Sequence, residues 1–433
     1  MFLARLLVLF SLVCISCAHS SFEQKQLKHA LDFATSNRLE LEILLQHYTY
    51  DSLKLEAAKF LIRNMPHCYS YQQGSEMDSV KRVRTYYSPF GQIDQTYARR
   101  WGHYTYRNLP KIYDAHIITA EYLIDNIDRA FDNWQKRPWN RSLSFEDFCE
   151  YLLPYRIGDE PLEEWRELYE KKYGYLLDSI YKGSDVVEAA NLVSRHLQEP
   201  VFIYCEDFEL PHIGPRYLFS HRYGSCVDAA DIVTYAFRAV GIPCMEDTDA
   251  RGGHVWNVVR DTTGRDVPIW YIASEAVRGS RDTGGYKRGK VYRPMYGFQE
   301  AKAAHLGDDW KSMPLLFYHP YMKDVSYAYY PDTLRILTGI PDDEVCYLAH
   351  FHEAHWWSCA CARSASGKME IPNLESELVY LPMKYTKGNY YSSGFPFWFA
   401  GGEINTFLPD WEKTVKVRLY RKYPVYGWLR SFM

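Results

Sequence analysis

The sequence has few of the features that mark membrane proteins or nucleic-acid-binding proteins. Beyond the N-terminal segment, no stretch approaches the roughly 18 consecutive apolar residues of a membrane-spanning helix. The formal net charge is only −4 and no cluster of lysine and arginine stands out, so neither nucleic acid nor an anionic membrane surface is favoured as a partner. The chain has 433 residues, 47% of them hydrophobic, and we expect two or three globular domains.

The cysteines form neither a zinc-binding motif nor a disulfide framework. Apart from Cys14 and Cys17 near the N-terminus, none of the cysteines is part of a CxxC pair. Cys359 and Cys361 point to the same face of a predicted strand, so we do not expect them to pair with each other. Cys346 could pair with one of them across a hairpin. We predict that most of these thiols are small buried residues. No metal ion or organic cofactor is implied.

The N-terminus is typical of an exported protein. The segment MFLARLLVLFSLVCISCAHSS places Arg5 before an apolar run and a small-residue exit, which is the pattern of a secretory signal peptide. The exit CISC resembles a bacterial lipoprotein signal in which Cys17 becomes the acylated first residue, although Cys14 stands where leucine is usual. We therefore predict a signal peptide over residues 1–17 and an extracytoplasmic protein, anchored to the bacterial cell envelope by a lipid on Cys17. Ordinary signal cleavage is the alternative.

Helical periodicity dominates the first part of the chain, and β-strand patterns dominate the last part. We predict an α+β protein with a helical region over 22–135, an α+β core over 140–305 and an antiparallel, sandwich-like β domain over 320–433. Predicted helix caps are Asn37, Asp51 and Ser144.

The middle of the core combines one helix with a β-hairpin. The helix is predicted over 226–240 and ends at Gly241. The segments HVWNVVRD and VPIWYIA form the hairpin, with Gly264 in its turn. Cys244 fits a core strand that follows the helix.

Cys226 and His254 are a candidate nucleophile and its base. Cys226 begins the helix, where unpaired backbone N–H groups and the helix dipole stabilise a thiolate and can later donate to an oxyanion. Gly224 removes side-chain bulk just before the thiol. His254 follows two glycines at the head of a strand and can take the thiol proton. The alternative is a buried structural thiol beside a structural histidine.

The segments GSCVDAADIVTYAFRAVGIPC and GGHVWNVV resemble the core of the transglutaminase-like superfamily. The shared pattern is a Gly-x-Cys at a helix start, an RAxGIPx exit and an HxWN strand. The segments LELEILLQHYTYDSLKLEAAKFLIRNMP and SFEDFCEYLLPYRIGDEPLEEWR look like the flanking regions of large bacterial lipoproteins that carry this domain. The resemblance implies a papain-like core with a Cys–His–acid site, in which Cys226 is the nucleophile and His254 the base.

The acid of the site is where the sequence departs from that superfamily. The common pattern has an aspartate four residues after a tryptophan, but Trp270 places Ser274 at this position, with Glu275 next. Asp261 and Asp266 flank the hairpin turn, and we expect both to lie too close to its tip. We predict Glu275 as the third catalytic residue. A missing acid would weaken the orientation of the histidine without abolishing activity.

Two further segments offer alternative sites. HFHEAHWW places His350 and His352 on one strand face, with His355 nearby, which is one way to build a metal site. It is not an HExxH motif, and the β pattern predicts exposed polar positions instead. The aromatic segments FPFWFAGG and NYYSSG fit either a sandwich core or a stacking surface for sugars or peptides.

Four residues near the candidate pair are predicted to support the fold or the site. We expect Trp256 and Asn257 to serve packing and strand pairing. Asp228 and Asp231 follow Cys226 on the helix, and we expect them on a solvated face or behind the site.

These features predict a secreted, lipid-anchored thiol enzyme. Attack of the Cys226 thiolate on a peptide or glycopeptide amide, assisted by His254, would give a thioester. Water would then make the protein an amidase or protease, whereas an amine would make it a cross-linking enzyme. Hydrolysis is favoured, by analogy with the fold. The alternative is a catalytically degenerate protein that binds glycan or protein at the cell surface.

Overall fold

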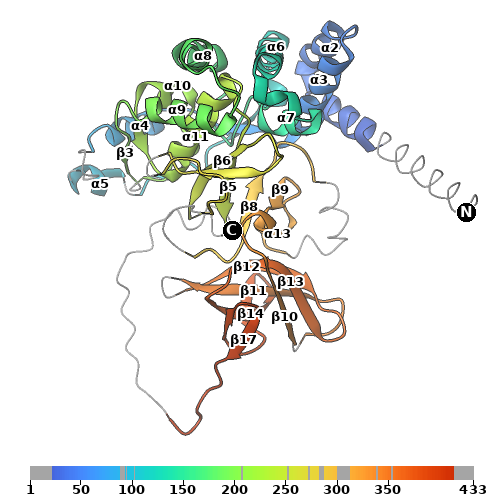
Figure 1. The fold of residues 1–433 in the computed structure, drawn as a ribbon, viewed down its shortest axis with the longest axis vertical. Helices are drawn as coiled ribbons and strands as arrows, with labels where there is room; N and C mark the ends of the chain where they lie inside the picture. The colour runs from blue at the N-terminus through green and yellow to red at the C-terminus, as the bar shows by residue number, and fades with distance from the viewer. Residues whose placement is uncertain are drawn as a thin grey trace, which may run out of the picture. The chain divides into compact units, whose positions relative to one another are not determined.

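The computed structural model describes residues 22–413 except 88–92, 94, 102, 206–207, 251–252, 272–273, 282–286, 300–312, 338–339 and 353–354. The predicted signal peptide and the C-terminal end of the predicted β domain, residues 414–433, lie outside the described residues. Helices and sheets are both well represented, so the chain is α+β (Figure 1). Within the described part of the chain, no helix has the length and apolar character needed to cross a membrane.

The chain folds into two compact units. Unit 1 consists of Met1–Ser184, Leu210–Tyr223 and Tyr235–Pro243, and unit 2 consists of Asp185–Glu209, Gly224–Thr234 and Cys244–Met433. Each unit is therefore built from several separate stretches of sequence.

Unit 1 is mainly helical. Helices α2, α3 and α6 pack on one another (Figure 1), and the short strands β1 (Tyr69–Tyr71) and β2 (Lys111–Tyr113) pair antiparallel. The helices of this unit include α2 (Arg38–His47), α3 (Ser52–Asn64), α4 (Ser75–Arg84), α5 (Gln95–Trp101), α6 (Ala120–Lys136), α7 (Phe145–Tyr151), α8 (Arg166–Tyr175) and α10 (Pro215–Ser220).

Two of the three predicted helix caps are confirmed. Asp51 and Ser144 cap α3 and α7, because each side chain accepts the backbone N–H three residues later at 3.1 Å. Asn37 occupies the N-cap position of α2 but makes no capping hydrogen bond. Its Nδ2 instead donates to the carbonyls of Ala115 and Ile118 at 3.1 and 2.8 Å. The capping role of Asn37 was therefore predicted wrongly, because distant carbonyls use its side chain.

Helix α11 (Cys226–Ala239) has its first residues in unit 2 and its last residues in unit 1. It ends at Ala239, and the predicted helix stop Gly241 follows with a φ of +81°. Side chains of unit 1 cover the carbonyls that the helix leaves unpaired: Asn133 Nδ2 donates to Ala239 at 3.1 Å, and Trp139 Nε1 donates to Gly241 at 2.9 Å. The C-terminal end of α11 is thus held by directional hydrogen bonds.

The first sheet of unit 2 is five-stranded and antiparallel, with the order β7-β6-β5-β8-β9. Strands β6 and β7 form the predicted hairpin, and Gly264 has a φ of +78° in its turn. Cys244 is fully buried at the start of β5, as predicted for a core strand. The strands are β5 (Cys244–Asp249), β6 (Val255–Arg260), β7 (Asp266–Ile269), β8 (Val291–Pro294) and β9 (Met322–Asp324).

A buried ion pair holds this sheet together. The Arg293 guanidinium contacts both carboxylate oxygens of Asp247, at 2.5 and 2.9 Å. Tyr329 donates its hydroxyl hydrogen to Asp247 at 2.6 Å and accepts the Trp256 indole N–H at 2.9 Å. Burial raises the pKa of Asp247, whereas Arg293 acts in the opposite direction. The chain of contacts fixes the Trp256 ring on its strand.

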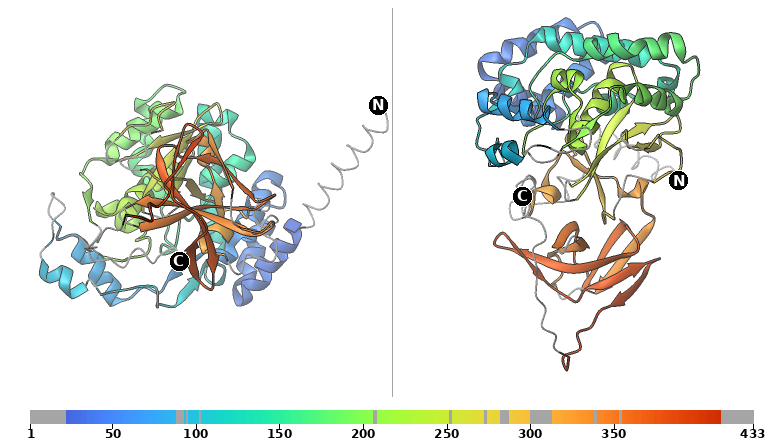
Figure 2. Two further views of the ribbon diagram at one scale, coloured as in Figure 1. Left: turned by 90° about the horizontal axis from the view of Figure 1, so that it is seen from below. Right: turned by 90° about the vertical axis from the view of Figure 1, so that its left-hand side faces the viewer.

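The C-terminal part of unit 2 contains a six-stranded antiparallel sheet with the order β12-β11-β14-β16-β17, in which β15 also pairs with β14, and a two-stranded sheet of β10 and β13. Figure 2 shows these strands in orange to red from two further directions. The strands are β10 (Asp332–Leu337), β11 (Val345–His352), β12 (His355–Arg363), β13 (Lys368–Leu374), β14 (Leu378–Thr386), β15 (Asn389–Ser392), β16 (Phe397–Ala400) and β17 (Glu403–Thr406).

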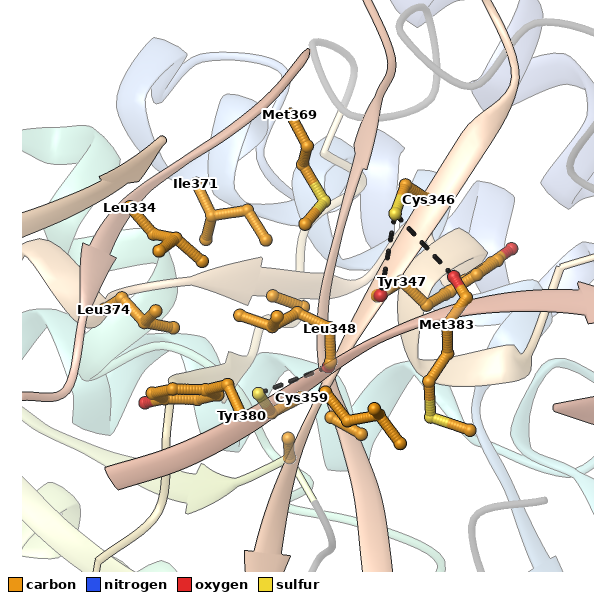
Figure 3. Packing of buried hydrophobic residues seen from close by; sticks show 14 of the residues in the cluster. Leu334, Cys346, Tyr347, Leu348, Cys359, Met369, Ile371, Leu374, Tyr380 and Met383 are labelled. Atoms are coloured by element: carbon orange, nitrogen blue, oxygen red, sulfur yellow. Dashed lines mark hydrogen bonds between the residues drawn. The ribbon is translucent and has the colours of Figure 1, made fainter. Parts of the chain in front are cut away.

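The core of this part is apolar and contains inert thiols (Figure 3). Cys346 donates to the Met383 carbonyl at 3.7 Å, and Cys359 donates to the Leu348 carbonyl at 3.4 Å. Burial raises the pKa of Cys346 to about 11 and that of Cys359 further still. The described cysteines are free thiols, and all except Cys361 are buried. The prediction of small buried thiols is thus confirmed, and the possible pairing of Cys346 across a hairpin does not occur.

Candidate functional site

The start of α11 is fixed by reciprocal hydrogen bonds. Ser225 precedes the helix, and its Oγ accepts the N–H of Val227 at 3.3 Å. Asp228 reaches back, and its Oδ2 accepts the N–H of Ser225 at 2.8 Å. This arrangement is a capping box, with serine at the N-cap and an acid three residues later. Cys226 is consequently the first residue of the helix, where the dipole and the backbone N–H groups favour negative charge.

Gly224 is required by the same turn. A Cβ atom at this position would lie 2.4 Å from Cβ and from Oδ2 of Asp228. No larger residue fits there without moving the carboxylate that caps the helix. Gly224 was predicted to clear the approach to the thiol. The absence of a side chain at Gly224 also makes room for Asp228.

Cys226 lines a pocket in unit 2. The thiol residue is only 7% exposed, and it borders a narrow cavity of about 10 Å³, which is room for roughly one water molecule. The pocket is lined mainly by apolar and aromatic side chains, which include Ala230, Val255, Trp256, Ile269, Trp270 and Tyr271. The thiol is therefore largely shielded from bulk water.

His254 lies against one wall of this pocket. Its ring stacks on Trp270 with ring centroids 3.7 Å apart, and on Trp256 with centroids 5.5 Å apart. Its carbonyl accepts the Thr248 hydroxyl at 3.0 Å, and the residue is 3% exposed. The imidazole is thus packed against two aromatic rings. His254 therefore contacts Trp270, which lines the pocket together with Cys226.

Asn257 joins strand β6 to helix α11. Its Nδ2 donates to the Ala230 carbonyl at 3.0 Å and to Thr234 Oγ1 at 2.9 Å. Thr234 in turn donates to the Glu246 carboxylate of β5 at 2.7 Å. Asn257 was predicted to serve packing and strand pairing, and it additionally fixes the helix that carries Cys226 against the strand that begins after His254.

Asp228 and Asp231 do not lie on a solvated face. They are 3% and 0% exposed, so that part of the prediction was wrong. The first helical turns of α11 are enclosed on the side of these residues, which the spacing of charges along the helix does not reveal. The Asp228 carboxylate brings negative charge close to Cys226 and opposes formation of the thiolate.

Glu275 is placed away from the pocket lining. Its Oε1 lies 2.5 Å from Arg195 of helix α9 (Val186–Leu197), and both side chains are about half exposed, 52% and 53%. Ser274 folds back on Trp270, because its N–H donates to the Trp270 carbonyl at 2.8 Å. The turn after Trp270 thus directs the Glu275 carboxylate to a surface ion pair. The structure does not bring Glu275 to His254.

The two acids that flank the hairpin turn are also engaged elsewhere. Asp261 Oδ1 accepts the backbone N–H groups of Thr263 and Arg265 at 2.8 and 3.0 Å. Asp266 Oδ2 accepts from Arg293 at 2.7 Å. The first carboxylate shapes the turn and the second belongs to the buried ion-pair network.

The structure describes most of the histidine-rich hairpin and the aromatic segment FPFWFAGG. His350 is fully buried, so the expectation of exposed polar positions was wrong for this residue, and His352 pairs with His355 across the hairpin. Among the described residues, no group of three or more His, Cys, Asp or Glu could hold a metal ion. Phe397 and Phe399 are buried in the core, which confirms the core interpretation for FPFWFAGG.

Sequence reasoning missed a group of acids on β5. Glu246, Asp247 and Asp249 are all nearly or fully buried, at 8%, 0% and 1% exposure. The available signal was three acids within four positions, MEDTDARGGH, immediately before the two glycines and His254. Acids in a buried strand need hydrogen-bond donors or cations as partners. Here such partners, Thr234 for Glu246 and Arg293 for Asp247, come from other segments of the sequence.

No protein-family model, no curated protein and no solved structure shows significant similarity to this chain. The functional argument therefore rests on the residues and their geometry.

Gly224→Ala should destabilise the protein, because the added methyl group would collide with Asp228. We expect a loss of about 1–3 kcal/mol in the free energy of unfolding, measured by urea denaturation. Gly174→Ala is the matched control: it lies within α8, and its Cβ would meet Glu170 Cγ at an ordinary 3.7 Å. Helix propensity predicts a small gain there. Equal effects of the two substitutions would contradict the steric role of Gly224.

Proposed function

We propose that this protein is a transglutaminase-like thiol enzyme that hydrolyses peptide or glycopeptide amide bonds through Cys226 and His254. The observation that carries the proposal is the placement of Cys226 at the capped start of α11, facing a pocket whose wall residue Trp270 also holds the His254 ring at 3.7 Å. The proposal includes a papain-like arrangement of the core and a sandwich-like arrangement of the C-terminal strands.

The chemistry begins with transfer of the thiol proton to the imidazole. The Cys226 sulfur then attacks the carbonyl carbon of the amide, and backbone N–H groups at the start of α11 donate to the oxyanion that forms. The imidazolium returns its proton to the departing amine, which leaves a thioester on Cys226. Water, deprotonated by the imidazole, attacks the thioester, releases the carboxylic acid and restores the thiol.

The electrostatics near Cys226 explain why the histidine is needed. The helix N-terminus favours the thiolate by about 0.3–1 kcal/mol for an ordinary site. The carboxylate of Asp228, which is 3% exposed, acts in the opposite direction. In the proposed mechanism, a cationic His254 supplies the further stabilisation that makes the sulfur reactive.

The pocket favours an apolar group next to the scissile amide. Its walls are formed by Trp256, Trp270 and Tyr271, and the one polar amide among its lining residues, Asn257, is already hydrogen-bonded to α11. A peptide substrate with an uncharged side chain at this position is therefore expected to bind better than one with a charged side chain.

Selective alkylation tests the proposed nucleophile. Cys361 is the most exposed of the described thiols, whereas Cys226 is nearly buried, so accessibility alone predicts that iodoacetamide modifies Cys361 first. Activation by His254 predicts that Cys226 is modified first at pH 7, and that Cys226→Ala abolishes hydrolysis of an internally quenched peptide library while Cys361→Ser does not. The sites are identified by peptide mass spectrometry. Faster modification of Cys361 together with an active Cys226→Ala protein would contradict the proposal.

We also propose that the chain is exported and anchored by a lipid on Cys17. Metabolic labelling with a clickable fatty acid in a bacterial host should mark the wild type and Cys14→Ser but not Cys17→Ser. Equal labelling of the two variants would contradict the lipoprotein signal.

A catalytically degenerate glycan- or protein-binding role remains the competing function. It predicts retained binding and no hydrolysis of any amide substrate, with or without Cys226.

A further inference from the structure

The end of strand β5 carries a buried carboxylate directly opposite His254. The antiparallel register of β5 and β6 pairs Thr248 with Val255, and the next pair along the ladder is Asp249 with His254. The Asp249 N–H donates to the His254 carbonyl at 3.2 Å. Residues directly opposite in an antiparallel pair have Cβ atoms roughly 4.5–5.5 Å apart, so the two side chains are neighbours.

Both side chains occupy the same face of the sheet. Alternation along β5 puts Asp249 on the face of Asp247, and alternation along β6 puts His254 on the face of Trp256. Asp247 and Trp256 are themselves opposite one another in the register and are linked through Tyr329. The pair of Asp249 and His254 is therefore the next step along the same face of the sheet.

The carboxylate is held in place by the backbone of Gly253. Asp249 Oδ1 accepts the N–H of Gly253 at 2.8 Å, and Asp249 is 1% exposed. A buried carboxylate costs free energy unless a donor or a cation satisfies it. An imidazolium opposite it on the same face would be such a cation.

We propose that Asp249 is the positioning residue that orients His254 and stabilises its protonated ring, the role that the sequence had assigned to Glu275. This inference rests on the proposed function of Cys226 and His254. When the thiol proton moves to the imidazole, the negative charge of Asp249 balances the new positive charge on the ring. This positive charge disappears when the ring returns its proton to the departing amine.

The other charged groups around His254 are already engaged. On β5, Glu246 binds Thr234 and Asp247 binds Arg293, whereas Asp228 caps α11 next to Cys226. On β7, Asp266 binds Arg293, and the Arg288 guanidinium lies 4.8 Å from the centre of the Trp256 ring. Asp249 is the acid whose backbone is bonded to His254.

Asp249→Asn tests the role of the charge with little change of shape. The asparagine oxygen can still accept the Gly253 N–H, so the loop is kept while the negative charge is lost. We expect the rate of Cys226 alkylation at pH 7 to fall about tenfold or more, which corresponds to about one unit in the ionisation of the thiol–imidazole pair. The full profile of rate against pH should shift as well, and Asp249→Glu should restore part of the rate.

The rate of Cys226 alkylation, measured also in His254→Ala and Glu275→Gln, separates the role of Asp249 from that of Glu275 and from the proposed function itself. If Asp249 acts through His254, Asp249→Asn has no further effect in the His254→Ala background. If His254→Ala is slow while Asp249→Asn and Asp249→Glu, both folded by circular dichroism, alkylate like wild type, the role of Asp249 is overturned and the proposed function stands. A slow Glu275→Gln beside a normal Asp249→Asn would return the role to Glu275. If His254→Ala alkylates like wild type, the proposed function and the role of Asp249 fail together.

Discussion

The hydrogen bonds of the Asn257 side chain are the constraint on which the site depends. They tie β6 to the Ala230 carbonyl and to Thr234 of α11, and Thr234 continues the connection to Glu246 of β5. These bonds are buried and directional, so a shift of the strand against the helix would leave polar groups unsatisfied at a cost of about 1–3 kcal/mol each. The positions of Cys226, four residues before Ala230, and of His254, three residues before Asn257, follow from this registration.

The electrostatics of the site are a balance of nearby charges. The helix start favours a thiolate at Cys226, while the capping carboxylate of Asp228 disfavours it, and the capping role makes the acid indispensable to the helix that carries the thiol. Stabilisation of the thiolate must then come from across the pocket. The ring of His254 stacks on the rings of Trp270 and Trp256, and in the proposed mechanism this ring accepts the thiol proton.

Local signals in the sequence predicted the elements that depend on local contacts. Asp51 and Ser144 cap their helices, Gly264 lies in the hairpin turn, and Gly241 follows the end of α11, because each of these features depends on residues only a few positions away. Asn37 is the exception, since its amide is used by carbonyls almost eighty residues away.

The features that depend on distant partners were not predictable in the same way. Glu275 has the spacing of a catalytic acid, but Arg195 of a different helix pairs with it. Asp228 was expected on a solvated face or behind the site, and the strand pattern around His350 predicted exposed polar positions. Other segments of the chain enclose both side chains and bury them. The acids of β5 resemble a solvated run in the sequence, and only the register with β6 shows that Asp249 lies opposite His254.

The most direct test of the central claim is to trap the acyl group on the enzyme. Wild-type protein is mixed with p-nitrophenyl acetate, quenched in acid within the first turnover and digested for mass spectrometry. The account predicts a burst of p-nitrophenol and one acetyl group on the peptide that contains Cys226, with a much slower burst in His254→Ala and none in Cys226→Ala. An acetyl group found on Cys361 or on lysines, with Cys226 unmodified, would contradict it.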